Sequence, residues 1–223
     1  MKLKSVVLGL VAAVGLSGAA MAKTVTFDFS AASSGSWASS LSYNVGGVGL
    51  TVTGSDTTGM AGQVQTWAGH GLGVKSATDC TFHGACFGSD HQVDASGRKD
   101  IVNLAFSQAV SITQIAFSYV DQNDTFDFYV SGNKLAQLGV SPLVAVNSTL
   151  GNLFGIGAGV SSQQVCRLFK GRNFCQTQWN FSAFKLTSVT VDAPAAVPVP
   201  AAGLMLLGGV GALAMFRRKR RAA

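Results

Sequence analysis

The sequence predicts an all-β fold, a single jelly-roll-like β-sandwich domain over residues 23–193. Gly accounts for 27 of the 223 residues, and all ten acidic residues are Asp, so turn formers are abundant and the helix former Glu is absent. Short runs rich in Val, Thr and Phe alternate between apolar and polar positions, as half-buried strands do. Gly, Ser, Asn and Asp separate these runs, which is the turn chemistry expected between the strands of a sandwich.

Six runs carry the strand pattern. They span residues 24–29, 49–53, 101–106, 110–119, 126–130 and 183–191. The third run places three apolar residues on one face: Val102, Leu104 and Phe106. The Ser107–Ala109 segment between the third and fourth runs indicates a hairpin, and segments 31–48 and 141–165 are expected to form long loops. About 170 residues are enough for one domain with a core of its own.

The formal net charge of +6 is concentrated at the two ends of the chain. Lys2 and Lys4 lie near the N-terminus, and five Arg and Lys residues fill positions 217–221, while residues 23–193 hold nine Lys or Arg against ten Asp. A basic nucleic-acid-binding domain is therefore excluded, because such a domain gathers its positive charge on the folded surface. The basic residues stand where membrane targeting places them.

Residues 1–22 have the three parts of a secretory signal peptide. Lys2 and Lys4 form the positive segment, residues 6–16 form a short apolar segment, and Ala20-Met21-Ala22 is a small-x-small cleavage site. Signal peptidase is therefore an expected partner, with cleavage after Ala22. A short N-terminal membrane helix is the alternative, but the apolar run is too short to span a bilayer comfortably.

Residues 194–223 predict a membrane-spanning tail. Three of the four prolines of the chain lie here: Pro194, Pro198 and Pro200. They break regular structure and form an extended spacer. The sixteen residues 201–216 are apolar, and the Arg-rich cluster that follows is expected to stay on the cytoplasmic side, with the domain before it outside.

This tail resembles the PEP-CTERM sorting signal, in its VPxPA variant. The resemblance covers residues 197–223, in which an apolar Gly/Leu-rich stretch separates the two motifs that carry it. Those motifs comprise Val197, Pro198, Val199, Pro200, Ala201, Arg217, Arg218, Lys219, Arg220 and Arg221. Val199 stands where the best-known pattern has Glu. The resemblance implies recognition by an exosortase, a membrane protease that removes the tail and releases the protein or transfers it to the cell surface. An unprocessed tail anchor is the alternative.

A second resemblance lies within the domain. Gly71-Leu72-Gly73-Val74 precedes Asp90-His91-Gln92-Val93-Asp94, then Gly97 and Asp100, and then a strand that ends at Phe106. This order is similar to that of exosortase-dependent surface proteins, over about residues 71–130. The resemblance implies a secreted β-domain and supplies no reaction.

Four cysteines predict disulfides in an exported chain. Three pairings are open, and we favour Cys80–Cys86 and Cys166–Cys175 because each closes one short loop. Each bridge is expected to shape its loop rather than to hold the fold. A zinc site formed by Cys80, His83 and Cys86 is the alternative, and an oxidising compartment argues against it.

A run of oxygen-bearing residues marks a candidate calcium site. Asp121, Asn123, Asp124 and Asp127 offer the carboxylate and amide oxygens that Ca²⁺ binds. The EF-hand pattern is absent, because other residues occupy the positions at which it requires Gly and Glu. Turn formation by Asp and Asn is the alternative, since both tolerate turn geometry. A structural calcium ion is thus the cofactor that these residues suggest.

The segment between Cys166 and Cys175 holds three cations and two Phe residues. Arg167, Lys170 and Arg172 form a compact positive loop on a nearly neutral domain, suited to an acidic polysaccharide or a phosphate group. A solvated hairpin is the alternative. Catalysis has little support, because no Gly-x-Ser-x-Gly elbow occurs and His91 is expected to bond locally in a loop.

The sequence therefore predicts an exported, exosortase-processed protein of the cell surface or extracellular matrix, associated with exopolysaccharide or biofilm, with a structural or adhesive role and no enzymatic activity. A carbohydrate-binding or carbohydrate-active module is the main alternative. Ice binding is a weaker one, prompted by the Thr24-x-Thr26 and Thr51-x-Thr53 pairs, which ordinary strand propensity also explains.

Overall fold

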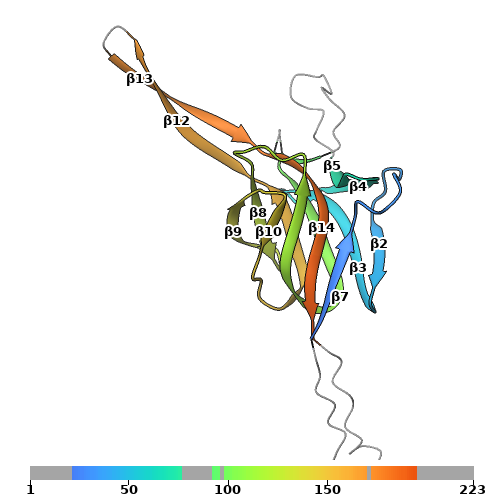
Figure 1. Cartoon of the computed structure of the whole chain (residues 1–223). Coiled ribbons are helices and arrows are strands. Elements are labelled where there is room, and N and C mark those ends of the chain that lie inside the picture. The colour runs from blue at the N-terminus through green and yellow to red at the C-terminus, as the bar shows by residue number, and fades with distance from the viewer. Residues whose placement is uncertain (1–21, 77–91, 96–97, 170–171, 195–223) are drawn as a thin grey trace, which may run out of the picture. The chain divides into compact units, whose positions relative to one another are not determined.

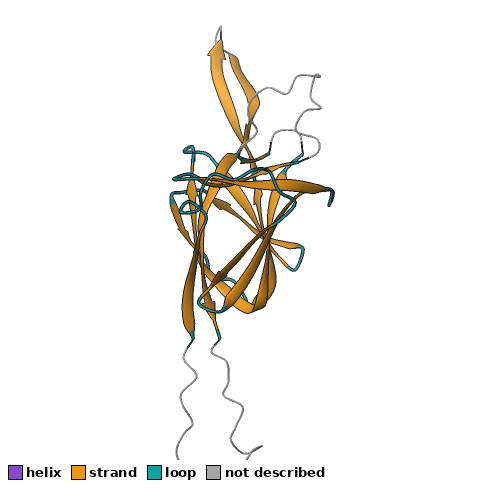
Figure 2. Cartoon of the chain, turned by 90° about the vertical axis from the view of Figure 1, so that its right-hand side faces the viewer, coloured by secondary structure: helices purple, strands orange, loops and turns teal. Residues whose placement is uncertain are grey.

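Every regular element in the described part of the chain is a β-strand in the computed structural model (Figures 1 and 2). The structure describes residues 22–76, 92–95, 98–169 and 172–194. The strands are β1 (Lys23–Asp28), β2 (Leu41–Val45), β3 (Val48–Asp56), β4 (Ala61–Trp67), β5 (Gly71–Lys75), β6 (Val93–Asp94), β7 (Asp100–Ser118), β8 (Thr125–Val130), β9 (Asn133–Gly139), β10 (Leu143–Ala145), β11 (Gly151–Ala158), β12 (Val160–Phe169), β13 (Arg172–Phe181) and β14 (Ala183–Ala193). The all-β prediction is confirmed.

Five of these strands close into a barrel. Strand β14 pairs with β5, β5 with β4, β4 with β3, β3 with β7, and β7 pairs back with β14, always antiparallel. Strands β11, β8 and β9 continue the sheet beyond β7, and β1 covers the outer edge of β14. Closure removes free edges from these five strands, because each finds a hydrogen-bonding neighbour on both sides.

Strand β7 is one strand of 19 residues, so the hairpin predicted at Ser107–Ala109 is wrong. Its first half pairs with β3 and β11, and its second half pairs with β14 and β10. The chain continues through the exposed Ser107–Ala109 segment without reversing, and the Gly49 main-chain N donates a hydrogen bond to the Ser107 hydroxyl there, at 2.9 Å.

The two segments predicted as long loops contain strands, so those predictions are wrong as well. Strand β2 lies within residues 31–48, and β10, β11 and the start of β12 lie within residues 141–165. The glycines of β11 fit close packing rather than turns: a Cβ added at Gly155 or Gly157 would lie 3.2 Å from the Ile101 side chain. Close approach of neighbouring side chains is a recognised reason for Gly within a strand.

Aromatic rings pack against one another in the buried core. The ring centroid of Phe117 lies 5.0 Å from that of Phe126 and 4.9 Å from that of Phe184. Val102, Leu104 and Phe106, predicted to share a face, are all buried. Complete burial of each large apolar side chain contributes about 1.5–3 kcal/mol, so this interior supplies most of the stability of the unit that spans Lys23–Ala193.

Candidate functional site

Strands β12 and β13 form a long hairpin that differs from the rest of the unit. They pair with each other over ten residues each and, among the described residues, with no other strand (Figure 1). Along β13 every side chain is exposed except that of Asn180, which is half-buried. A two-stranded ribbon with so little burial is marginal when isolated, so its geometry depends on its root and on its crosslink.

The root of the hairpin is fixed to β8 and β9 by hydrogen bonds. Asn180 Nδ2 donates to the Asn123 carbonyl at 2.8 Å, and Gln137 Nε2 donates to the Val160 carbonyl at 2.9 Å. The Gly159 main-chain N donates to the Thr125 carbonyl at 2.9 Å, and a Cβ added at Gly159 would lie 2.8 Å from that same oxygen. Gly159 therefore permits a close approach that any side chain would prevent.

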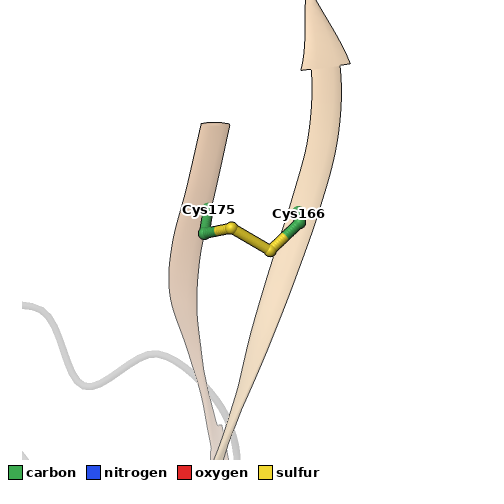
Figure 3. The surroundings of a disulfide bond; sticks show 2 residues. All are labelled: Cys166 and Cys175. Carbon is green, nitrogen blue, oxygen red and sulfur yellow. A yellow bond between two sulfur atoms is a disulfide. The ribbon is translucent and has the colours of Figure 1, made fainter. Parts of the chain in front are cut away.

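The disulfide between Cys166 and Cys175 confirms the pairing predicted for these two residues (Figure 3). Their Cα atoms are directly opposite each other in the β12–β13 register. The bridge ties the two strands near the far end of the hairpin. It closes a short loop, for which the loss of chain entropy in the unfolded state amounts to about 2.5 kcal/mol.

One face of the hairpin carries two arginines and an aromatic ring. Arg167 lies opposite Phe174, and Arg172 lies two positions from Phe174 on the same strand, so the three side chains share a face. We call Arg167, Arg172 and Phe174 the cationic face. All three are exposed, and Phe174 keeps 55% of its surface open to solvent. A groove of about 830 Å³ runs along this face, with Arg167, Phe174 and Gln178 in its lining.

Both arginines of the cationic face are available to a ligand. Within the described ranges, neither Arg167 nor Arg172 forms an ion pair with an acidic side chain, whereas Arg98, Lys99 and Lys134 do. The third predicted cation, Lys170, lies outside the described residues.

The four residues of the candidate calcium site are used in different ways. The Asp124 carboxylate accepts a hydrogen bond from the Asp121 main-chain N at 2.7 Å, and the Asn123 carbonyl accepts the bond from Asn180. Burial raises the pKa of Asp124. Asp127 is buried in β8 and pairs with Lys134 at 2.7 Å and with Lys99 at 3.4 Å. Among the described residues, no three acidic, His or Cys side chains gather into a group that could hold a metal.

Several predicted features fall outside the described residues. These are residues 1–21 of the predicted signal peptide, the Cys80–Cys86 bridge with its zinc alternative at His83, residue His91, and residues 195–223 of the predicted tail. Within the described part of the chain, there is no helix that is long and apolar enough to cross a membrane.

The threonine pairs that prompted the ice-binding alternative lie apart in the sheet. Thr24 and Thr26 are on β1, and Thr51 and Thr53 are on β3, two strands that do not pair with each other. Thr24 donates to the Asp192 carboxylate at 2.6 Å, and the Thr26 hydroxyl lies 2.9 Å from that of Thr190. These hydroxyls are engaged in cross-strand pairs between β1 and β14.

Sequence reasoning missed an aromatic cluster around a buried lysine. The Lys185 ammonium lies 3.7 Å from the centroid of the Trp67 ring and 5.3 Å from that of Tyr119, and burial lowers the pKa of this lysine. Tyr119 has a φ of 55° and its hydroxyl lies 3.0 Å from Nδ1 of His70. The sequence feature that could have indicated this cluster is a charged residue between Phe184 and Leu186 in a predicted strand. Cation–π contact accounts for its burial.

Comparison with known proteins gives no relative: no family model, no curated protein and no solved structure matches the chain.

Proposed function

We propose that the chain is an exported surface or extracellular-matrix protein with a structural or adhesive, non-enzymatic role, whose β12–β13 hairpin contacts acidic exopolysaccharide. The observation that carries this proposal is the cationic face, in which Arg167, Arg172 and Phe174 are exposed together on a crosslinked hairpin. The rest of the unit acts as the scaffold that presents it.

The chemistry of the cationic face suits carboxylated sugars. A guanidinium group offers paired N–H donors that match the two oxygens of a carboxylate, and an adjacent aromatic ring covers the apolar face of a sugar ring. Because the ribbon is tied by Cys166–Cys175 and fixed at its root, little chain entropy is lost when a polymer binds.

Export is supported by the same disulfide, since such bonds persist in oxidising compartments. The proposal includes cleavage by signal peptidase after Ala22, membrane anchoring through residues 194–223 before processing, and removal of the tail by an exosortase that recognises the 197–201 motif. The mature protein is expected at the cell surface or outside the cell. Intact mass of the protein recovered from its native cells tests this, and a mass equal to that of all 223 residues contradicts both cleavages.

The jelly-roll-like sandwich belongs to the same proposal. The two halves of β7 pair with different strands, and the Phe27 and Phe106 rings pack 5.6 Å apart between β1 and β7. Both observations support two facing sheets joined by one bent strand. Nuclear Overhauser contacts between these two rings are expected, and their absence contradicts the facing arrangement.

Retention on immobilised polygalacturonate tests the adhesive role. We expect replacement of Arg167, Lys170 and Arg172 with Ser to abolish retention, and added NaCl to weaken retention of the unaltered chain through screening. The matched control compares two double variants, Arg167→Ser with Arg172→Ser on the hairpin and Lys23→Ser with Lys75→Ser on the scaffold, which remove the same charge and break no ion pair of the described residues. Equal retention of the two double variants contradicts the hairpin as the contact element.

The carbohydrate-binding module is the second candidate function. It is favoured by a polar cleft at the root of the hairpin, whose residues offer hydroxyls and amides and a tryptophan ring.

A further inference from the structure

A cleft of about 380 Å³ lies where the hairpin joins the scaffold. Its walls come from residues 122–125 at the start of β8, from the end of β9, and from the first residues of β12 and the last of β13. The volume falls in the range of sites that hold a small ligand. We call this the root cleft.

The lining of the root cleft is polar and almost without charge. Five of its eleven residues carry side-chain amides and three carry hydroxyls. Asp124 is the one residue with a carboxylate among them, and its oxygen already accepts the Asp121 main-chain N–H. The lining contains no Lys or Arg from the described part of the chain. A phosphate or carboxylate ligand therefore meets no positive partner here.

Two of the amides are free to bind. Gln163 and Gln178 lie directly opposite each other in the hairpin register, and both are exposed. Neither side chain makes a hydrogen bond with the rest of the described chain. A side-chain amide both donates and accepts, which matches a sugar hydroxyl that also does both.

Trp179 supplies the apolar part of the root cleft. Side chains alternate along β13, so Trp179 faces away from Gln178, and the cleft that both of them line extends around the edge of this strand. Trp179 keeps 60% of its surface exposed. The exposed ring on one face of the strand can stack on the C–H face of one sugar, while the free amides on the other face bind the hydroxyls of a neighbouring sugar in a chain that passes around this edge.

The root cleft is also ordered before any ligand arrives. The bond from Asn180 Nδ2 to the Asn123 carbonyl crosses between two of its walls, and the bond from Gln137 to Val160 fixes the first residue of β12. The close approach at Gly159 sets the spacing of these walls. Affinity gains from such order, because the protein loses little freedom on binding.

We infer that the root cleft binds a short neutral oligosaccharide, with Gln163 and Gln178 bonded to its hydroxyls and Trp179 stacked on one sugar ring. Gln178 also lines the groove of the cationic face, so the two sites are contiguous. This inference deepens the proposed function, since a polymer that carries neutral sugars next to acidic ones can occupy both sites at once.

The test uses the full chain, purified in a detergent without sugar, and a set of short neutral gluco-, manno- and galacto-oligosaccharides beside polygalacturonate. We expect at least one neutral oligosaccharide to bind, Trp179→Ala to weaken its affinity about tenfold or more, and Gln178→Ala to weaken it about three- to tenfold. Phe181→Ala and Gln176→Ala are matched controls, because both residues lie on β13 outside the lining, and both are expected to bind as the unaltered chain does.

The outcomes separate this inference from the proposed function. The Ser variant of Arg167, Lys170 and Arg172 is expected to keep neutral binding while it loses polygalacturonate. No binding of any neutral oligosaccharide, or binding unaffected by both Trp179→Ala and Gln178→Ala, overturns the root cleft even if acidic retention is intact. Neutral binding that is lost in these two variants supports it even if acidic retention fails. Circular dichroism confirms that each exposed-site variant is folded.

Discussion

The barrel and the β12–β13 hairpin are stabilised by different interactions. In the barrel, strands close on one another and aromatic rings such as Phe184 are fully buried, so its geometry rests on packing. In the hairpin most of the described side chains are exposed, and its geometry rests on one disulfide and the hydrogen bonds at its root. Stability and the proposed recognition therefore fall on different strands, and substitutions in one region are expected to leave the other unchanged.

The largest effect is expected in the barrel core. Phe184→Ala removes a fully buried ring that packs on Phe117, and the lost burial and the resulting cavity are expected to cost about 3–5 kcal/mol in the free energy of unfolding. Urea denaturation measures this. Phe174→Ala, the equivalent change on the hairpin, is expected to cost under about 0.5 kcal/mol. Similar losses for both variants contradict the view that packing stabilises the barrel and not the hairpin.

A buried turn carboxylate comes next. Asp56 accepts hydrogen bonds from the Thr58 and Met60 main-chain N atoms and pairs with Arg98, so Asp56→Ala is expected to cost about 1–3 kcal/mol by urea denaturation. Asp28 makes the same kind of turn with Ser30 and Ala31 but is exposed. Asp28→Ala is the matched control with the smaller expected loss.

The same carboxylate predicts acid sensitivity. Burial raises the pKa of Asp56, but the hydrogen bonds from Thr58, Met60 and Arg98 outweigh it and lower the pKa to about 2. A lowered pKa means that the unfolded state takes up the proton first, so the contribution of Asp56 is complete above pH 4 and is lost as the pH falls toward 2. Unfolding of the Asp56→Ala variant should show a shallower pH dependence over this interval. Parallel curves for variant and unaltered chain contradict the assignment.

Loss of the disulfide is expected to act on the hairpin alone. In a Cys166→Ser/Cys175→Ser variant the melting temperature of the barrel should shift by less than about 2 °C, because the bridge joins two strands that pair only with each other in the described chain. Trypsin should cut this variant faster after Arg167 and Arg172, as mass spectrometry of the fragments reports. An equal fall in barrel stability shows that the two regions unfold together.

The smallest effect is expected from a chelator. Because Lys99 and Lys134 already neutralise Asp127, we expect EDTA to shift the melting temperature by less than about 1 °C. A drop of several degrees that calcium reverses supports the calcium site predicted at Asp121, Asn123, Asp124 and Asp127.

The sequence predicts those parts of the fold in which burial alternates. One side of β7 meets the core, so the alternating pattern correctly predicted the shared face of Val102, Leu104 and Phe106. Residues 161–165 gave no such signal, since both faces of the hairpin are in solvent and its polar residues look like a loop. The cysteine spacing predicted the crosslink, yet the root cleft depends on contacts between residues such as Asn123 and Asn180, which lie 57 positions apart. The spacing of residues along the chain does not predict contacts between residues so far apart in sequence.

Strand β14 connects the hairpin to the opposite end of the unit, and this determines how the unit carries a pulling force. This strand begins two residues after the hairpin ends, and it finishes beside Lys23, where the register pairs Lys23 with Ala193. Its eleven residues cover about 36 Å. Under the proposed function, tension between a polymer held by the hairpin and an attachment at Ala193 runs along the covalent backbone of β14 and puts no shearing load on its hydrogen bonds to β1 and β7. The β1–β14 ladder is loaded in shear when the two strands are pulled against each other from opposite ends. Single-molecule pulling between positions 28 and 193 should therefore show a higher rupture force than pulling between 23 and 193, where the same ladder opens from one end.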